Sequence, residues 1–283
     1  MVWTLTTTLA EFRTAAGEFL AADPVGNTVL LTVVERIERD GPYAYGGAAP
    51  DYGWWREPDG TVTGATLRTP PYGRRLGRMT TGAAGELARV LAAWEETLGA
   101  VGGGREETLA FAAEWERRTG RSWIVESHER LYRLGELTPP PAPPAGRARL
   151  AGEADRELAV QWLGAFCAEA ETQPPGDLRA DADQRIAAGT LLLWEDGDGR
   201  VASLAGASPA IAGMSRIGPV YTPRERRGRG YASALTAAAS AHARARGAAE
   251  VLLYTDLANP VSNAIYQRIG YVPVGDSVYV AFR

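Results

Sequence analysis

A proline-rich segment divides the chain near its middle. Residues 138–146 read Thr-Pro-Pro-Pro-Ala-Pro-Pro-Ala-Gly, with five prolines in nine positions. Such a run favours extended polyproline structure, and it cannot continue a helix or join the interior of a sheet. The 283 residues are also enough for about two domains of roughly 150 residues each. We therefore expect one domain over residues 1–137, a linker over 138–146, and a second domain over 147–283.

The two halves show nearly the same order of expected elements. Apolar periodicity and turn signals predict strands in the second half at 147–150, 191–194, 201–207, 214–222, 251–255 and 277–282. The helices expected there cover 155–171, 183–188, 232–246 and 260–269. In the first half we expect strands at 2–5, 43–55, 62–69 and one ending at 134, and helices at 9–21, 28–37, 85–98 and 106–119. This pattern predicts an α/β (α+β) fold used twice, each copy a central mixed sheet flanked by helices.

The composition excludes several classes of site. All 30 basic residues are arginine, so neither a P-loop lysine nor a lysine Schiff base is possible. One cysteine and two histidines disfavour a structural zinc site, and we expect no metal. The net charge of -4 does not indicate a broad nucleic-acid surface. The sequence shows neither a long apolar run nor a signal-like start, so we expect a cytoplasmic protein without a membrane segment.

The segment over residues 217–232 carries the clearest chemical signal. It reads as the end of a strand, a loop rich in glycine and arginine, and the start of a helix. Small residues let backbone N–H groups converge, and the helix dipole adds positive potential at the same point. Four of the 30 arginines lie within Arg224–Arg229. The segment is therefore expected to bind a pyrophosphate with a further phosphate nearby.

Two motifs in this half resemble those of the GNAT acyltransferase superfamily. Arg227-x-x-Gly230-x-Ala232 matches the family signature for acetyl-coenzyme A binding, and a second block runs from Tyr254 to Tyr271. The resemblance is specific over residues 190–283 and topological over 147–190. In the first half the corresponding segment, residues 80–86, lacks the arginine and contains Glu86, which would repel phosphate. We interpret that half as a degenerate GNAT-like domain without a donor site.

The resemblance assigns roles around the loop. It implies that backbone groups of Val220, Tyr221 and Thr222 pair with the pantetheine arm of acetyl-CoA, the co-substrate. It implies that the pyrophosphate is held by backbone amides of Gly228, Arg229, Gly230, Tyr231 and Ala232. Arg227 occupies the signature position. Arg226 and Arg229 either reach the outer phosphates or are simply solvated.

The second block supplies the candidate catalytic residues. Asn259 precedes Pro260 and is expected first to cap a helix, with a contact to the pantetheine also open. Asn263 and Tyr266 share a face of that helix. The resemblance places Tyr266 against the coenzyme sulfur, where its hydroxyl can protonate the leaving thiolate as a tetrahedral intermediate collapses. The alternative for Tyr266 is a core tyrosine.

The proton acceptor is less clear. Many family members use a glutamate on the strand before the loop, but residues 213–222 contain no carboxylate. Asp256, just after the following strand, is the nearest candidate, and stabilisation of the loop before Asn259 is the alternative role for it. A water chain or an amine that is already neutral would also serve.

Together these residues favour an enzyme that moves an acetyl group from acetyl-CoA to a small-molecule amine, by analogy with tandem GNAT proteins. Part of an aromatic stretch in the first half, from Tyr43 to Tyr72, could line an acceptor cleft. One alternative is a non-catalytic acyl-CoA-binding or sensing module. Another is transfer to a protein N-terminus, or from a donor such as aminoacyl-tRNA. A homodimer stays open.

Overall fold

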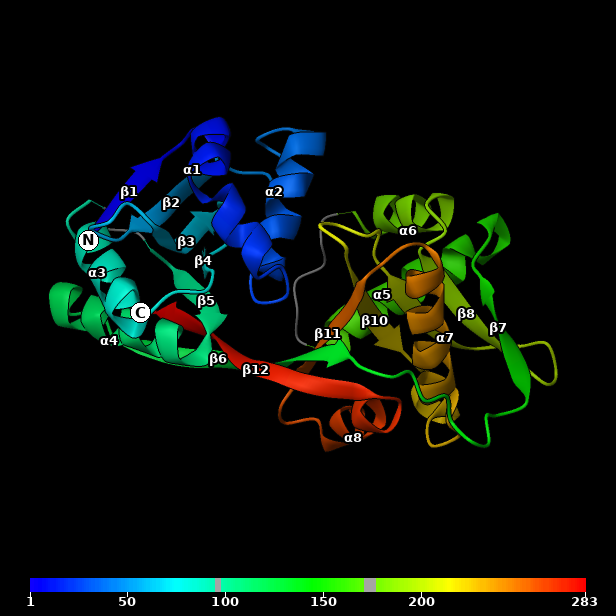
Figure 1. The fold of residues 1–283 in the computed structure, drawn as a ribbon. Coiled ribbons are helices and arrows are strands. Elements are labelled where there is room, and N and C mark those ends of the chain that lie inside the picture. Colours follow the sequence, from blue (N-terminus) through cyan, green and yellow to red (C-terminus); the bar gives the residue numbers. More distant parts are fainter. Residues whose placement is uncertain (95–97, 171–176) are drawn as a thin grey trace. The chain divides into compact units, whose positions relative to one another are not determined.

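The computed structural model describes residues 1–94, 98–170 and 177–283. Contacts between residues divide the chain into two compact units (Figure 1). Unit 1 comprises Met1–Leu131, Asp256–Ala258 and Gly275–Arg283, and unit 2 comprises Tyr132–Thr255 and Asn259–Val274. Two strands, β6 (Trp123–Leu134) and β12 (Tyr271–Phe282), therefore run from one unit into the other. The units are not the two contiguous pieces that the proline-rich segment suggests.

Unit 1 is a mixed sheet with two pairs of helices. Its strands follow the order β1-β2-β3-β4-β5-β12, with β4 and β5 parallel and the other pairs antiparallel. The strands are β1 (Val2–Thr6), β2 (Asp51–Arg56), β3 (Val62–Arg68), β4 (Arg74–Leu76), β5 (Ala100–Gly104) and the end of β12. The helices are α1 (Leu9–Ala22), α2 (Thr28–Asp40), α3 (Thr81–Ala92) and α4 (Arg105–Thr119).

Separate apolar clusters flank the unit 1 sheet. Phe12 and Leu30 of α1 and α2 pack with Tyr52 and Leu67 of the sheet. A second cluster joins α3 and α4 to β12, whose Val278, Val280 and Phe282 are buried among Leu87, Phe111 and Trp115. The end of the chain is thus part of the core of unit 1.

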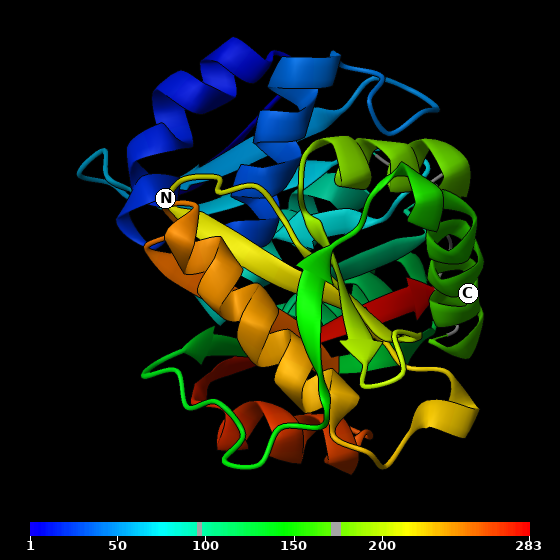
Figure 2. The ribbon, with the colours of Figure 1, turned by 90° about the vertical axis from the view of Figure 1, so that its right-hand side faces the viewer.

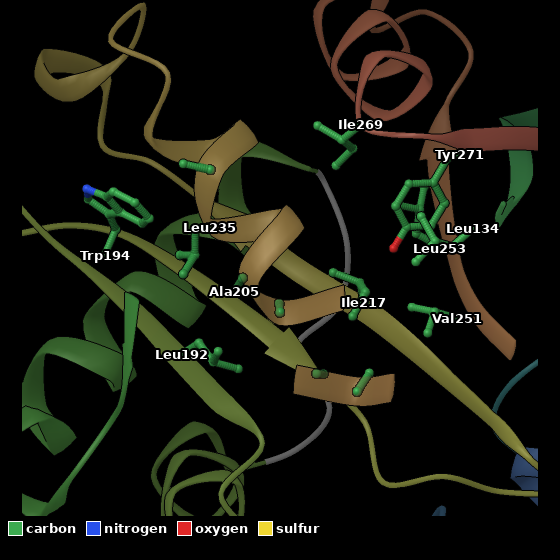
Figure 3. Close-up of a cluster of buried hydrophobic side chains, with 14 of the residues drawn as sticks. Leu134, Leu192, Trp194, Ala205, Ile217, Leu235, Val251, Leu253, Ile269 and Tyr271 are labelled. Atoms are coloured by element: carbon green, nitrogen blue, oxygen red, sulfur yellow. The ribbon is translucent and has the colours of Figure 1, made fainter. Parts of the chain in front are cut away.

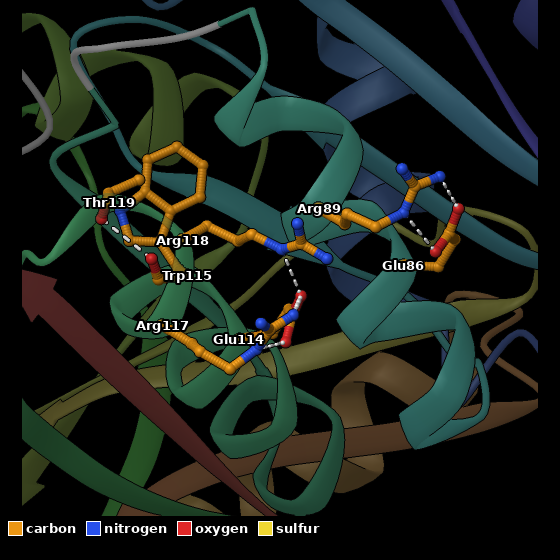
Figure 4. A network of polar contacts seen from close by, with 7 residues as sticks. All are labelled: Glu86, Arg89, Glu114, Trp115, Arg117, Arg118 and Thr119. Carbon is orange, nitrogen blue, oxygen red and sulfur yellow. Dashed lines mark hydrogen bonds and ion pairs between the residues drawn. The ribbon is translucent and has the colours of Figure 1, made fainter.

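Ion pairs within each helix line the surfaces of α3 and α4. Glu86 forms a bidentate pair with Arg89 on α3, and Glu114 accepts from both Arg117 and Arg118 on α4 (Figure 4). These partners are three or four residues apart, the spacing that places side chains on one helix face. The charge of Glu86 is therefore compensated, which weakens the argument that it would repel a phosphate.

Unit 2 repeats the arrangement. Its strands follow the order β11-β10-β9-β8-β7, with β10 and β11 parallel and the others antiparallel. The strands are β7 (Gly146–Leu150), β8 (Leu191–Asp196), β9 (Val201–Ala207), β10 (Met214–Tyr221) and β11 (Glu250–Asp256). The helices are α5 (Arg156–Glu169), α6 (Leu178–Ala187), α7 (Tyr231–Ala245) and α8 (Pro260–Arg268).

Helix α7 lies across one face of the unit 2 sheet (Figure 2). It has an alanine-rich buried face, and Leu235 shares one apolar cluster with Leu192, Ala205 and Val251 of the sheet (Figure 3). A different cluster, which includes Trp162 of α5 and Leu193 of β8, joins α5 and α6 to the sheet. No helix in the described residues is long and apolar enough to cross a bilayer.

The structure confirms the mixed α/β fold and corrects some element boundaries. The strand expected over residues 43–55 begins only at Asp51, because Gly41, Gly46 and Gly47 adopt positive φ angles and form turns before it. The helix expected from Asp183 begins at Leu178, where the Asp177 side chain accepts from Arg179 N. The expected helices 85–98 and 155–171 end at Ala92 and Glu169; residues 95–97 and 171 lie outside the described residues.

Candidate coenzyme site

The strands β10 and β11 pair over only the first part of β10. Their parallel register covers Met214 to Arg216 against Glu250 to Leu252. Further along β10, residues 217–221 pair with β9 on the other side, with a register shift between Ile217 and Val220. The backbone of Val220, Tyr221 and Thr222 is thus placed at a diverging edge of the sheet, as its expected pairing with an extended ligand requires.

The glycine–arginine loop, residues 223–230, connects this edge to α7. Gly228 and Gly230 have φ angles of 75° and 83°, a region in which glycine is at little cost. Gly230 precedes Tyr231, the first residue of α7, and no side chain caps this helix. The first N–H groups of this 15-residue helix, which follow the loop directly, are therefore not occupied by a capping side chain. This arrangement suits an anionic group such as a pyrophosphate.

Three of the four loop arginines are paired with carboxylates. Arg227 donates from Nη2 to Glu169 Oε2 at 2.5 Å and from Nε to the Thr222 carbonyl at 2.8 Å. Arg224 lies 3.6 Å from the same glutamate, which ends α5. Arg226 is paired with Asp196 of β8 at 2.8 Å. Arg229 contacts the Glu225 carbonyl at 3.5 Å.

The contacts of Arg227 give it a structural role. Its side chain holds the loop against the end of β10 through the Thr222 carbonyl, and against α5 through Glu169. Its positive charge holds the pKa of the Glu169 carboxyl below the usual range. The sequence did not point to Glu169 or Asp196, because they lie 58 and 30 residues before their partners and no local pattern connects them.

Helix α8 begins as the sequence predicted. The Asn259 side chain accepts a hydrogen bond from Ser262 N at 3.1 Å, and Pro260 fills the first helical position. Asn263 Nδ2 donates to the Asn259 carbonyl at 2.8 Å, while its Oδ1 accepts from Tyr132 Oη at 2.9 Å. Both asparagines thus support the start of α8, and the capping role expected for Asn259 is present.

Tyr266 lies among other tyrosines of unit 2. Its ring centroid is 6.4 Å from that of Tyr132 and 6.1 Å from that of Tyr271. Burial raises the pKa of the Tyr266 phenol to about 12, although a hydrogen bond with Ser262 acts in the opposite direction. At neutral pH the hydroxyl keeps its proton, which is the form that an acid requires.

Asp256 is the last residue of β11 and is exposed. Its Oδ1 accepts a hydrogen bond from Ala258 N at 2.8 Å. This contact shows the loop-stabilising role that the sequence left open beside the role of base. Asp256 groups with unit 1, whereas Tyr266 groups with unit 2. Among the described residues, no cluster of three or more His, Cys, Asp or Glu could hold a metal ion.

In unit 1 the segment that corresponds to the loop, residues 80–86, has backbone groups that are already hydrogen-bonded to side chains. Thr80 Oγ1 accepts from Ala83 N at 3.1 Å, so the start of α3 is capped. Trp3 Nε1 donates to the Ala83 carbonyl at 2.8 Å. An amide that is already bonded is less available to a phosphate, in contrast to the uncapped start of α7.

Comparisons with known proteins address the same residues. A family model described as "Acetyltransferase (GNAT) family" matches residues 156–271, which span the loop, Asn259 and Tyr266. Residues 156–271 are a GNAT-family domain. The matched range includes both the uncapped start of α7 and the strands β10 and β11.

Solved structures extend the likeness of the fold to the whole chain. A GNAT-family acetyltransferase from Colwellia psychrerythraea is 11% identical with a TM-score of 0.61, and the match covers 100% of this chain and 99% of that one. A GCN5-related N-acetyltransferase from Sphaerobacter thermophilus is 18% identical with a TM-score of 0.62, covering 98% and 94%. A Drosophila protein is 13% identical with a TM-score of 0.67, and the match covers 100% of this chain and 98% of that one. The GNAT domain is therefore accompanied by a second, N-terminal GNAT-like fold. No curated protein matches the sequence.

Proposed function

We propose that the protein transfers an acetyl group from acetyl-CoA directly to the amine of a small molecule. The observation that supports this most strongly is the uncapped start of α7 beside the glycine–arginine loop, at the edge where β10 and β11 diverge. Backbone donors for a pyrophosphate and a strand edge for an amide-containing arm are thus adjacent in one unit. Acetyl-CoA would supply the acetyl group already activated as a thioester.

The remaining roles belong to side chains of the chain itself. Tyr266, with its proton retained at neutral pH, would protonate the leaving thiolate. Asp256 would accept the proton of the attacking amine. The residues of β10, from Met214 to Tyr221, include no carboxylate that could do so instead.

The deciding experiment measures free thiol released from acetyl-CoA across small amines, peptides and antibiotics, with the mass of the product identifying the acyl group. We expect release with at least one small amine and a mass increase of that amine by one acetyl group. Tight coenzyme binding in calorimetry without release from any acceptor would instead indicate the non-catalytic binding module, which the absence of a carboxylate on β10 favours. Release only with peptides would indicate a protein N-terminus as acceptor.

A further inference from the structure

Unit 1 contains a polar row across the middle of its sheet that the donor site does not use. Gly102 of β5 pairs with Arg75 of β4 on one side and with Tyr279 of β12 on the other. Arg75 lies flat on the tyrosine, with its Cζ 4.8 Å from the ring centroid. A guanidinium stacked on a ring in this way keeps its N–H edge available for other groups.

Two glycines make room for this stack. A Cβ atom at Gly102 would lie 2.7 Å from Arg75 Nη1 and 2.6 Å from Tyr279 Cδ2. A Cβ atom at Gly73 would lie 2.6 Å from Tyr279 Oη, to which Gly73 N donates at 3.2 Å. Any larger residue at either position would displace the pair, so the local sequence is adapted to hold the guanidinium and the ring together.

Two carboxylates come from the strands that follow β12 in the sheet order, β6 and β11. Glu129 of β6 is half-buried and interacts electrostatically with both Arg75 and Asp256. Burial raises the pKa of the Glu129 carboxyl, the charge of Asp256 adds to the rise, and Arg75 opposes it. Leu257 N donates to the His128 carbonyl at 2.9 Å, which holds the segment containing Asp256 against β6. One guanidinium and two carboxylates are thus grouped in unit 1.

The guanidinium group of Arg75 is only partly buried. Within residues 1–94, 98–170 and 177–283, no hydrogen bond or close ion pair is found for the guanidinium group of Arg75, which lies over the Tyr279 ring and interacts at longer range with the charge of Glu129. Arginine binds a carboxylate through two parallel hydrogen bonds, and carboxylates bind an ammonium group. The cluster therefore offers complementary charge for both ends of one small zwitterion.

We propose that Arg75, Tyr279, Glu129 and Asp256 form an acceptor site for an α-amino acid. Arg75 binds the carboxylate, Glu129 and Asp256 bind the ammonium group, and the ring of Tyr279 lies against the aliphatic part. This inference rests on the proposed function through Asp256, which is also the proposed proton acceptor. It narrows the acceptor from any amine to an amine with an adjacent carboxylate.

The test compares matched ligands in calorimetry. Each α-amino acid is titrated beside the amine that lacks only its carboxylate, such as phenylalanine beside phenethylamine, in the presence of coenzyme A. We expect at least one amino acid to bind about tenfold or more tightly than its amine, because a charge-assisted pair contributes an effect of that order. Arg75→Gln should abolish this difference in affinity between the amino acid and its amine. Arg75→Lys keeps the charge but cannot form the two parallel hydrogen bonds, so it should restore part of the difference.

Arg36→Gln is the matched control. Arg36 also lies over a tyrosine of unit 1, with its Cζ 4.7 Å from the Tyr45 ring centroid, but it is not part of the cluster. This variant should bind amino acids as the unmodified protein does. The proposal is overturned if no amino acid binds better than its amine, or if Arg75→Gln keeps the preference while remaining folded by circular dichroism.

Thiol release separates this inference from the proposed function. If an amino acid binds in an Arg75-dependent way but no thiol is ever released, the acceptor site stands and the transferase proposal fails. If simple amines release thiol as efficiently as their amino acids, the transferase proposal stands and the amino-acid site fails.

Discussion

At the scale of single residues, the hydroxyl of Tyr266 is the most direct test of the chemistry. Tyr266→Phe keeps the ring between Tyr132 and Tyr271 but removes the proton donor. We expect kcat to fall about 100-fold or more, because general acids commonly contribute on that order, with little change in the Kd for coenzyme A. Steady-state kinetics and calorimetry measure the two quantities.

A neighbouring tyrosine provides the control. Tyr271 is buried and its Oη is 2.7 Å from Ser240 Oγ, so Tyr271→Phe also removes a phenol from this cluster. It should reduce the free energy of unfolding and leave kcat nearly unchanged. If Tyr266→Phe turns over as fast as the unmodified protein, Tyr266 is not the acid.

Glu169 competes with phosphate for the loop arginines. Glu169→Gln removes the negative charge that Arg224 and Arg227 share, so we expect acetyl-CoA to bind more tightly by up to about fivefold, the scale of an exposed ion pair. Calorimetry at low and high salt checks this, since the gain should shrink as salt screens the charges. Weaker binding would mean that Glu169 serves mainly to position Arg227.

The same pair makes a prediction about pH. Arg227 lowers the pKa of Glu169 in the folded protein below its usual value of 4.5. The pair therefore stabilises the fold at pH values above about 4.5, and its contribution is lost as the pH falls through the lowered pKa. Urea unfolding of the unmodified protein and Glu169→Gln should thus differ at pH 7 and converge in acid.

The roles of single residues were predicted where their partners lie nearby in the sequence, and were missed where the partners are far away in the sequence. Asn259 was predicted as a helix cap because its partner, Ser262 N, is three residues away. The pairing of Arg226 with Asp196 and of Arg227 with Glu169 could not be predicted, because only the fold brings these residues together. The cluster around Arg75 was missed for the same reason, since its members come from four strands.

At the scale of elements, the start of α8 can be tested separately from the coenzyme. Asn259→Ala removes the cap on Ser262 N and should reduce the free energy of unfolding by about 1 kcal/mol. Asn259→Asp keeps an acceptor at this position and should restore most of that stability. Urea denaturation of both variants provides the measurement.

Coenzyme binding by the same two variants separates the roles of Asn259. If Asn259 only caps the helix, Asn259→Asp should bind acetyl-CoA like the unmodified protein. A large loss of affinity in a stable Asn259→Asp would show a direct contact with the coenzyme. Among the elements, α8 was predicted well because a helical pattern and a cap agreed, whereas over residues 43–50 aromatic residues suggested a strand that three glycines prevent.

At the scale of the whole molecule, the two units depend on distant parts of the chain. A fragment of residues 1–137 lacks β12 and thus Val278, Val280 and Phe282 from its core. Burial of three such side chains is worth roughly 5–8 kcal/mol, comparable with the stability of a whole domain. We expect this fragment to lack cooperative unfolding and near-ultraviolet circular dichroism.

Restoring the missing strand should reverse this loss. The same fragment with residues 271–283 attached through a flexible linker should unfold cooperatively. If residues 1–137 fold equally well alone, β12 is dispensable to unit 1. The crossing of β6 and β12 was not predictable from the sequence, because pairing of Tyr279 with Gly102 joins positions that no local pattern relates.

The position of β12 also delays the folding of unit 1 during synthesis. Domains at the N-terminus normally fold first as the chain leaves the ribosome, at about 5–20 residues per second. Unit 1 instead waits for Gly275–Arg283, which are made on the order of 10–30 s after Leu131. Through that interval the nascent chain presents the edge of β5 without its partner, a surface prone to pair with other chains and suited to a chaperone.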